Sequence, residues 1–291
     1  MKFLIVGDLH GQKPKIHFKD FDAIIAPGDF CSDAPRKHMF AAMKKRKETG
    51  KDVWWWDMVD GKRKGMQMVK QSLADGRKIT EYLNSFGVPV YAVPGNWDWS
   101  PEDPRDPDCM LLNRNYYPDL FEGLSNIIDV HLRGYTIDGL RIIGHGITSG
   151  PEMPQTPKEQ KGTPISVVSL TRWYERRLER LRQLFLRSPL PALFLSHNVP
   201  YNTALDQITN LHNPRHGQHF GSVIARRLIE EFQPPVCVGA HMHEHFGKCM
   251  MGKTVCINAG FGGKVNTLLE LSDSGKILQL RFYPSSGEIP P

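Results

Sequence analysis

Short runs of apolar residues recur in the first third of the chain, and each ends in glycine followed by a polar residue. The runs, with the residues that close them, are 2–6 before Gly7-Asp8, 22–26 before Gly28-Asp29, and 88–93 before Gly95-Asn96. Uninterrupted apolar strands are typical of a sheet that is covered on both faces. The pattern therefore predicts a parallel β-sheet with a ligand site at the carboxyl ends of its strands.

The second half of the chain also reads as rich in strands. Further apolar runs lie at 130–137, 140–143, 192–195, 236–238, 254–257, 267–271 and 277–282. Asp138-Gly139 separates the first two of these and is a hairpin signal. Residues 100–118 and 148–164 are rich in turn-forming residues and predict loops.

Helical patterns occur in three segments. Residues 34–86 predict mostly helix, divided by four glycines: Gly50, Gly61, Gly65 and Gly76. Apolar residues then recur at helical spacing between Leu170 and Phe185, with arginines on the opposite face. Ser222 is expected to cap a helix that runs to about Phe232. The link between the first two strands is too short to hold a crossover helix comfortably.

Composition places the chain among globular proteins. It has 291 residues, of which 40% are hydrophobic and 23% charged. The longest apolar runs fall far short of the roughly 18 residues that a membrane span needs, and Asp8 comes too early for a secretory signal. Without a repeat or a linker, we expect one domain over residues 1–291, located in the cytoplasm and without a membrane partner.

The basic charge of the chain is concentrated in one segment. The net charge is +6, and residues 36–78 contain 13 Lys and Arg against 5 Asp and Glu. The rest of the chain has 24 basic and 26 acidic residues. Such a segment can attract polyanions, including nucleic acid. The alternative is a solvated helical surface without a partner.

The cysteines argue against two common scaffolds. There are five, at positions 31, 109, 237, 249 and 256, and no Cys-x-x-Cys motif occurs. An odd number without that spacing predicts neither a disulfide framework nor a thiolate zinc site.

Seven candidate metal ligands follow the apolar runs. They are Asp8, His10, Asp29, Asn96, His197, His241 and His243. Taken singly, each has an ordinary structural interpretation as a turn residue, a helix cap or a buried histidine. Together they are too many for one catalytic zinc, and they suit two divalent ions that share a bridging carboxylate.

In these motifs the chain resembles the calcineurin-like metallophosphoesterases, from Asp8 to about Phe282. The later part is also similar to the small prokaryotic Icc-like phosphoesterases. The matching stretches are Gly221-Ser222, His241-Met242-His243-Glu244, Gly252-Lys253-Thr254 and Ile257-Asn258-Ala259-Gly260. The resemblance implies an α/β (α+β) fold, a four-layer α-β-β-α sandwich of two mixed sheets. The segment at about 36–78 would then be a basic helical insert.

The resemblance also implies the metal centre and its chemistry. It assigns Asp8, His10 and His243 to one ion, Asn96, His197 and His241 to the other, and Asp29 to a bridge between them. Mn²⁺ is the expected ion, with Fe, Zn and Ni as alternatives, because mixed Asp, Asn and His ligands do not select sharply. The implied reaction is hydrolysis of a small phosphodiester or phosphomonoester by a metal-bridging hydroxide, with Asp29 and Asn96 acting through the metals.

One position departs from the family pattern. The third motif usually reads Gly-Asn-His-Asp or Gly-Asn-His-Glu, whose histidine helps protonate the leaving group, but here that position is Trp97. An indole donates a hydrogen bond and does not titrate, so Trp97 either binds a phosphate oxygen or packs. Asp98 keeps its place without the histidine that it would orient. Good leaving groups are therefore expected, or another acid chosen from His145, His216, His219 and His245.

Two other functions stay open. The first is a nuclease, in which the basic insert holds phosphates and Trp54, Trp55 and Trp56 stack on bases. The same insert could instead cover the site or form a homo-oligomer contact. The second is a non-catalytic metal-binding scaffold, although all seven ligand positions are filled. Among the remaining polar residues, Cys31 is expected to pack, and Arg172, Arg176, Arg177 and Arg180 are expected to be a solvated helix face.

Overall fold

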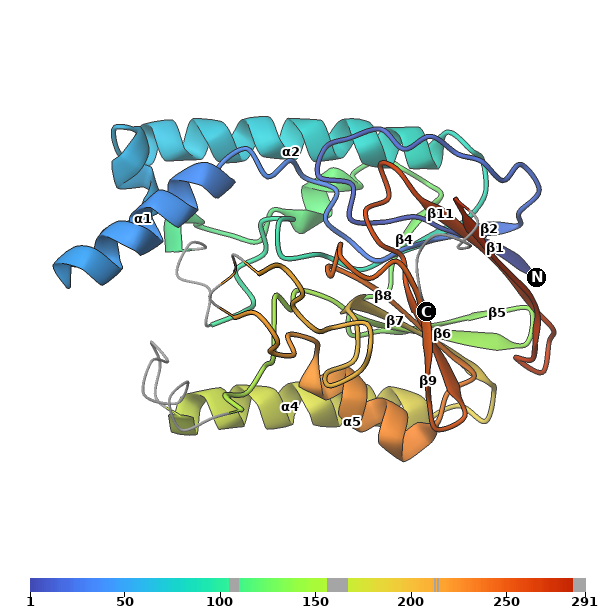
Figure 1. Cartoon of the computed structure of the whole chain (residues 1–291). Coiled ribbons are helices and arrows are strands. Elements are labelled where there is room, and N and C mark those ends of the chain that lie inside the picture. The colour runs from blue at the N-terminus through green and yellow to red at the C-terminus, as the bar shows by residue number, and fades with distance from the viewer. Residues whose placement is uncertain (105–109, 156–166, 212, 214, 285–291) are drawn as a thin grey trace.

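The computed structural model describes residues 1–104, 110–155, 167–211, 213 and 215–284, and two six-stranded sheets form its centre (Figure 1). The strands of the first sheet, in spatial order, are β12 (Ile277–Tyr283), β11 (Asn266–Leu271), β1 (Lys2–Ile5), β2 (Ala23–Ala26), β3 (Val90–Ala92) and β4 (Ile127–Asp129). The strands β1 to β4 are parallel, whereas β11 and β12 are antiparallel additions at one edge.

The second sheet is mixed as well. Its strands, in order, are β5 (Gly134–Ile137), β6 (Leu140–His145), β7 (Ala192–Asn198), β8 (Val236–Ala240), β10 (Thr254–Asn258) and β9 (Gly247–Met251). The inner four are parallel, and the two edge strands are antiparallel to their neighbours. The run expected at 130–137 is shorter than predicted, because only its last four residues pair with β6.

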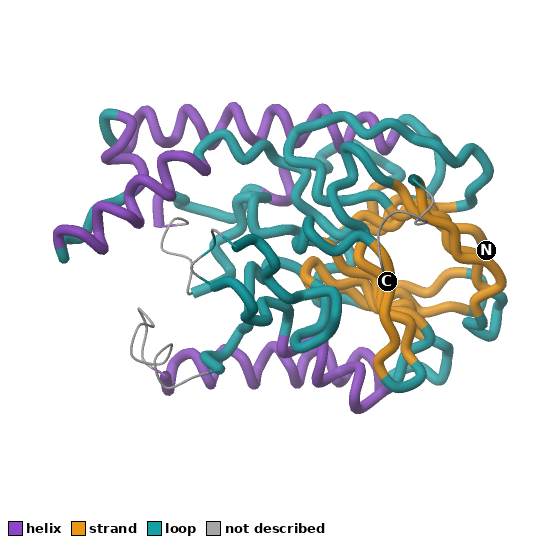
Figure 2. The backbone as a smooth tube through the Cα atoms, viewed as in Figure 1, coloured by secondary structure: helices purple, strands orange, loops and turns teal. Residues whose placement is uncertain are grey.

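Helices cover the outer faces of both sheets, so the predicted four-layer sandwich is confirmed (Figure 2). Over the first sheet lies α2 (Lys62–Asn84), with the 3₁₀ turns η1 (Trp55–Val59) and η3 (Tyr117–Leu120) packed against it. Helix α1 (Arg36–Thr49) packs on η1 and projects away from the sheets (Figure 1). On the second lie α4 (Val167–Leu186) and α5 (Val223–Phe232). The link between β1 and β2 contains no helix, as expected. None of the described helices has an apolar stretch that could cross a membrane.

The alternation of side chains explains the uninterrupted apolar runs. In β1, Phe3 and Ile5 pack between the two sheets, whereas Leu4 packs in the layer beneath α2. Because both faces of the strand are covered, neither set can be polar. The same packing fixes the ends of the strands, and these ends carry the polar residues.

The glycines of the long helical segment behave in two ways. Gly50 and Gly61 end and begin helices with positive φ, as predicted. The prediction was wrong for Gly65 and Gly76, which lie inside α2 and are buried. A Cβ at Gly76 would lie 2.7 Å from the Cys31 Sγ, so this glycine lets the helix approach the loop after β2. Close packing against neighbouring residues explains why both positions are glycine, and neither glycine breaks the helix.

The burial of side chains counts against one open alternative and corrects one expectation. Trp55 and Trp56 are 0% and 4% exposed, so neither can stack on a nucleic-acid base. Trp54 stacks on Trp56 with ring centres 5.2 Å apart. On α4, Arg177 is buried and its Nη2 lies 2.9 Å from His131 Nε2. The other three arginines of that face, Arg172, Arg176 and Arg180, are exposed as expected.

The described cysteines are free thiols. They are Cys31, Cys237, Cys249 and Cys256, and Cys109 lies outside the described residues. Cys31 is fully buried against α2, and burial raises the pKa of its thiol well above the usual value. A protonated buried thiol is a packing group, as the sequence indicated.

Candidate dinuclear metal centre

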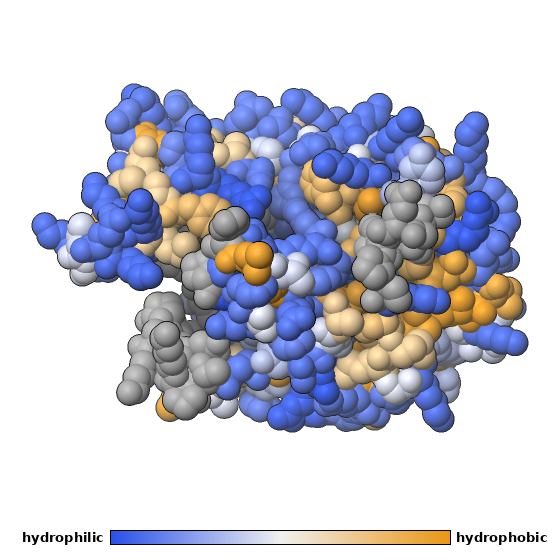
Figure 3. Space-filling view, in the orientation of Figure 1, coloured by the Kyte–Doolittle hydropathy of each residue, from blue (hydrophilic) through white to orange (hydrophobic). Residues whose placement is uncertain are grey.

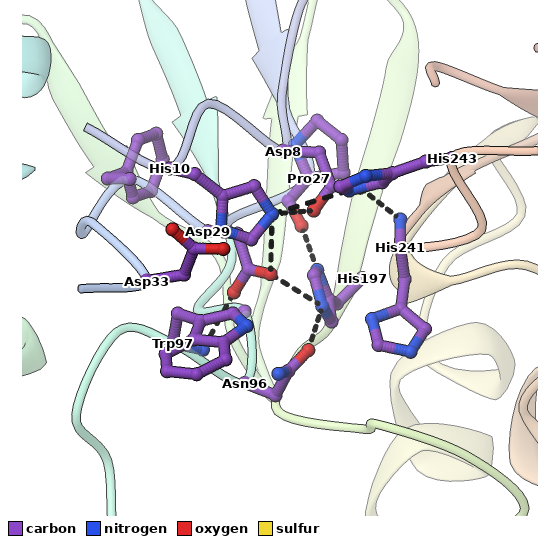
Figure 4. A network of polar contacts seen from close by, with 12 residues as sticks. Asp8, His10, Pro27, Asp29, Asp33, Asn96, Trp97, His197, His241 and His243 are labelled. Atoms are coloured by element: carbon purple, nitrogen blue, oxygen red, sulfur yellow. Dashed lines mark hydrogen bonds and ion pairs between the residues drawn. The ribbon is translucent and has the colours of Figure 1, made fainter. Parts of the chain in front are cut away.

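All seven candidate ligands converge at the carboxyl ends of the parallel strands (Figure 4). Those of the first sheet follow β1, β2 and β3, and those of the second come from the end of β7 and the loop after β8. Two groups of three lie close enough to share an ion, with ligand atoms within 4.8 Å of one another. The first group is Asp8, His10 and His243, and the second is Asp29, His197 and His241.

The first group brings three side chains into contact and contains an unsatisfied carboxylate oxygen. His243 Nε2 lies 2.8 Å from Asp8 Oδ2 and 3.3 Å from His10 Nε2. Asp8 is fully buried, and its Oδ1 has no hydrogen-bond partner. An orphaned buried carboxylate oxygen is costly unless a cation or donor faces it. The donor set therefore fits a divalent ion.

In the second group, a histidine nitrogen without a proton faces an acceptor oxygen. His197 Nδ1 lies 2.7 Å from the Pro27 carbonyl oxygen, which only accepts, so that nitrogen carries the proton. Burial lowers the pKa of His197 to about 4, so the ring is neutral and its Nε2 carries a bare lone pair. This nitrogen lies 2.9 Å from Asn96 Oδ1, a second acceptor. A bare nitrogen that faces an amide oxygen at this distance suits a cation bound by both atoms.

Asp29, a member of the second group, also faces the first group. Its Oδ2 is 3.8 Å from His10 Nε2 and 3.7 Å from His197 Nε2. Two ligands of one ion, each bound at roughly 2.1 Å, lie about 3–3.5 Å apart, so these separations are close to those of shared ions. The other oxygen, Oδ1, accepts the Trp97 backbone N–H at 2.7 Å. One carboxylate therefore faces both groups while the chain holds it in place.

The electrostatics of the carboxylates also favour a cation. Burial first, and then the charges of Asp8 and Asp98, raise the pKa of Asp29 well above its usual value. Burial alone would raise the pKa of Asp8 too, but the hydrogen bond and charge of His243 outweigh it and lower that pKa. Bound divalent ions would stabilise both carboxylates in their ionised form.

The backbone at these residues is strained. Asp8, His10, Asp29 and His241 have φ of 57°, 45°, 56° and 68°, in the left-handed region that favours glycine. Each such residue costs roughly 1–3 kcal/mol and persists only where its surroundings hold it. Here the amides of Leu9 and His10 donate to the Asp29 carbonyl, and the His241 amide donates to Asp8 Oδ2. Strain concentrated at these positions is typical of a functional site.

Asp98 organises the centre, and the sequence analysis missed that role. It is fully buried and accepts four backbone N–H bonds. The donors are Asp29 at 2.9 Å, Phe30 at 2.8 Å, Cys31 at 3.0 Å and Gly95 at 2.8 Å. These bonds join the loop after β2 to the loop after β3. The only signal for Asp98 in the sequence is its position after Asn96-Trp97. That position does not reveal which backbone amides the carboxylate binds.

Phe261 is a second residue that the sequence did not single out. It lies in a glycine-rich loop after β10, and its ring centre is 5.3 Å from that of His243 and 6.2 Å from that of His10. Trp97 approaches His10 edge-on at 6.4 Å. Two aromatic rings thus border the first group.

The four histidines considered as alternative acids have other surroundings. The recorded partners are Glu152 for His145, Asp206 for His219 and the Gln207 carbonyl for His245, while His216 is exposed. None of these partners is a candidate ligand. His145 is fully buried, and burial lowers its pKa. These contacts lie outside both ligand groups, so nothing in them favours an acid role.

Comparison with known proteins places this arrangement in a family. The family model of calcineurin-like phosphoesterases matches residues 1–245. The chain belongs to this family. It is therefore a hydrolase of phosphoric esters, with two clusters of His and Asp metal ligands. No curated protein matches the chain.

Solved structures agree with the fold. One aligns over 97% of both chains at 15% identity with a TM-score of 0.60. TT1561 of Thermus thermophilus aligns over 97% of both chains at 16% identity with a TM-score of 0.50. A dimetal phosphatase from Danio rerio aligns over 93% of this chain and 92% of its own, at 12% identity and a TM-score of 0.48. At these identities the first two likenesses show the fold alone, and at its TM-score the third carries no argument.

Proposed function

We propose that the chain hydrolyses a small phosphodiester or phosphomonoester at two divalent ions held by the seven candidate ligands. The observation that carries this proposal is Asp29, whose Oδ2 faces His10 and His197 at 3.8 and 3.7 Å. The proposed ion is Mn²⁺, because the mixed oxygen and nitrogen ligands suit it, with Fe, Zn or Ni as alternatives. One domain over the whole chain, a cytoplasmic location and the Icc-like subgroup belong to the same proposal.

The chain's own residues prepare the site for substrate. Two divalent ions bound there would supply positive charge beside the phosphoryl oxygens and a water acidic enough to ionise near neutral pH. The Pro27 carbonyl orients the His197 ring, and the Trp97 amide orients the Asp29 carboxylate. Trp97 has no titratable proton, so its side chain can bind an oxygen but cannot protonate a leaving group.

The two alternatives are less well supported. A nuclease would use the basic insert, whose helix α1 has six basic residues and one acidic residue, but two of its three tryptophans are buried. A non-catalytic scaffold would not require two complete groups of ligands around one shared carboxylate. A homo-oligomer contact through the insert is compatible with either function.

Removal and restoration of metal tests the proposal. Protein stripped by a chelator should lose hydrolysis of bis(p-nitrophenyl) phosphate and of p-nitrophenyl phosphate, and Mn²⁺ should restore it. The reason is that these ligands leave activation of water and neutralisation of charge to the ions. The ratio of the two rates will show whether the site prefers a diester or a monoester. If both substrates stay inert while the protein binds metal, the scaffold interpretation gains and the proposed function fails.

Substitution of Trp97 by histidine tests the missing acid. Trp97→His should raise turnover of phenyl phosphodiesters at least about tenfold more than that of p-nitrophenyl diesters, because general acid catalysis typically contributes 10²–10⁴-fold to poor leaving groups. Steady-state kinetics on a series of substituted phenyl diesters will measure this dependence. An unchanged dependence on the leaving group in Trp97→His would show that protonation is not what the site lacks.

A further inference from the structure

Two cysteines face each other at one edge of the second sheet. In the antiparallel pair of β9 and β10, Cys249 and Cys256 are direct partners. Residues directly opposite each other in such a pair have Cα atoms roughly 4.5 or 5.5 Å apart. A disulfide bond needs a Cα separation of about 4.4–6.8 Å. The strand register therefore already holds the two residues within the range of a disulfide.

The two side chains also point to the same side of the sheet. Cys256 belongs to the apolar layer beneath α4 and α5, and Cys249 packs against that layer. The Cys256 thiol donates a hydrogen bond to the Cys249 sulfur. The sulfur atoms are therefore neighbours, so a bond between them requires no rearrangement of the strands.

The two thiols differ in their access to solvent. Cys256 is 0% exposed, whereas Cys249 is partly exposed and lies on β9, an edge strand. Met250, the next residue of this strand, is 61% exposed. Figure 3 shows hydrophobic side chains at the surface where Figure 1 draws β9. A small oxidant can thus reach Cys249, while Cys256 is enclosed behind it.

The acidity of the two thiols assigns them different roles. A hydrogen bond from Cys256, and then those of the Thr203 hydroxyl and the Ala204 amide, outweigh burial and lower the pKa of Cys249. The hydrogen bond to Cys249, and then burial, raise the pKa of Cys256. Because the thiolate is the reactive form, Cys249 is the thiol that an oxidant meets first. Cys256 is then placed to react with the oxidised sulfur.

We infer that Cys249 and Cys256 form a reversible disulfide when the folded protein meets hydrogen peroxide. The Cys249 thiolate attacks one oxygen of the peroxide, so that an S–O bond forms, the O–O bond breaks and hydroxide leaves. The Cys256 sulfur then attacks the Cys249 sulfur. The S–S bond forms, the S–O bond breaks, and the Cys256 proton leaves with the departing hydroxide as water. The two sulfurs together lose the two electrons that reduce the peroxide.

The hairpin that this bond would cross-link adjoins the turn between the two histidines that follow β8. The Asn258 Nδ2, at the end of β10, donates to the Met242 carbonyl oxygen at 2.7 Å, and Met242 lies between His241 and His243. An edge strand opens more easily than the centre of a sheet, and a cross-link opposes that opening. Oxidation should therefore slow amide hydrogen exchange in β9, residues 247–251.

Peptide mapping of the full chain tests the inference without relying on a variant. The folded protein is treated briefly with hydrogen peroxide, its remaining thiols are alkylated in denaturant, and it is digested with trypsin. Trypsin cuts between the two cysteines after Lys253, which gives peptides 249–253 and 254–264. We expect a disulfide to join these two peptides, and dithiothreitol to release them. The result does not depend on bound metal, so it is separate from the proposed function.

Three variants test the order of the steps. In Cys256→Ala, oxidation of Cys249 should stop at the sulfenic acid, which dimedone traps. In Cys249→Ser, Cys256 should stay reduced, because a fully buried thiol is closed to the oxidant. Cys237→Ala is the matched control, since Cys237 is the fully buried partner of Cys256 on β8. It should form the same disulfide as the wild-type protein.

The outcomes that overturn the inference are distinct. One is alkylation of both peptides after peroxide treatment of the folded wild-type protein. Another is a link between peptides 228–248 and 254–264, because Cys237 would then be the partner. A disulfide that forms only in urea-unfolded protein would overturn it as well, because the strand register would then play no part. Unchanged amide exchange at 247–251 with the disulfide formed would show that the bond does not hold the edge strand.

Discussion

Replacement of Asp29 by asparagine should abolish metal-dependent hydrolysis while leaving the fold intact. We expect kcat/KM for bis(p-nitrophenyl) phosphate to fall at least about 1,000-fold, which corresponds to roughly 4 kcal/mol of lost transition-state stabilisation. The asparagine side chain would keep the oxygen that accepts the Trp97 amide, so the loop can retain its shape. It would lose the negative charge that faces both His10 and His197.

Elemental analysis provides the second readout for Asp29→Asn. The metal content should fall from about two ions per chain toward one or none, because the proposed function has both ions share this carboxylate. Asp20→Asn is the matched control, since Asp20 is exposed and pairs with Lys2 far from the centre. Full activity in Asp29→Asn with both ions retained would contradict the bridging role and, with it, the proposed mechanism.

The candidate ligands could be predicted because each one is marked locally. An apolar run followed by Gly28 and Asp29 identifies the end of a buried strand and its polar residue together. The carboxyl ends of parallel strands in one sheet must meet at one edge, so residues distant in sequence become neighbours. His197, near the end of β7, and the two histidines after β8 contribute ligands from the second sheet in the same way. Spacing along the chain thus carries most of the information about which side chains converge.

The residues that support these ligands could not be predicted in this way. Asp98 acts through four amides that belong to two loops, and nothing in its local sequence indicates which amides these are. Phe261 is one aromatic residue in a glycine-rich loop, and only the packed structure places it against His10 and His243. Such roles depend on tertiary contacts and not on local pattern.

The misread glycines and tryptophans have the same cause. Gly76 looks like a helix breaker, yet its missing side chain makes room for Cys31 against α2. Trp55 looks like an exposed stacking platform beside basic residues, yet it is fully buried beneath α2. In both cases the identity of the residue is clear from sequence, whereas its burial is decided by a neighbour that is far away in the chain.

Substitution of Asp98 by asparagine should have the largest effect on stability of any change near the centre. The amide keeps the shape of the carboxylate but offers one acceptor oxygen, so two of the four buried N–H groups would face its NH₂. An unsatisfied buried donor costs about 1–3 kcal/mol, so we expect the free energy of unfolding to fall by roughly 2–5 kcal/mol. Urea unfolding of the chelator-treated protein measures this loss without a contribution from bound metal.

Asp206 offers a matched control, because it is an equally buried carboxylate with donors of its own. Four of them, the amides of Asn202, Thr203 and Gly221 and the Nδ1 of His219, lie at 2.7–2.9 Å, and the Thr203 hydroxyl lies at 3.5 Å. Asp206→Asn should therefore destabilise the chain by a similar amount. Since its bonds lie within residues 202–221, it should leave metal affinity unchanged.

Metal affinity separates the two variants and shows what Asp98 contributes. Asp98 fixes the backbone of Asp29 itself and of Gly95, whose Cβ position would lie 2.0 Å from Asp29 Oδ1. If the bridging carboxylate depends on that support, Asp98→Asn should weaken Mn²⁺ binding about 10- to 100-fold, as loss of outer-shell partners typically does. Equal metal affinity in the Asp98 and Asp206 variants would show that Asp98 only stabilises the fold. A difference confined to Asp98 would show that four backbone hydrogen bonds position the metal centre.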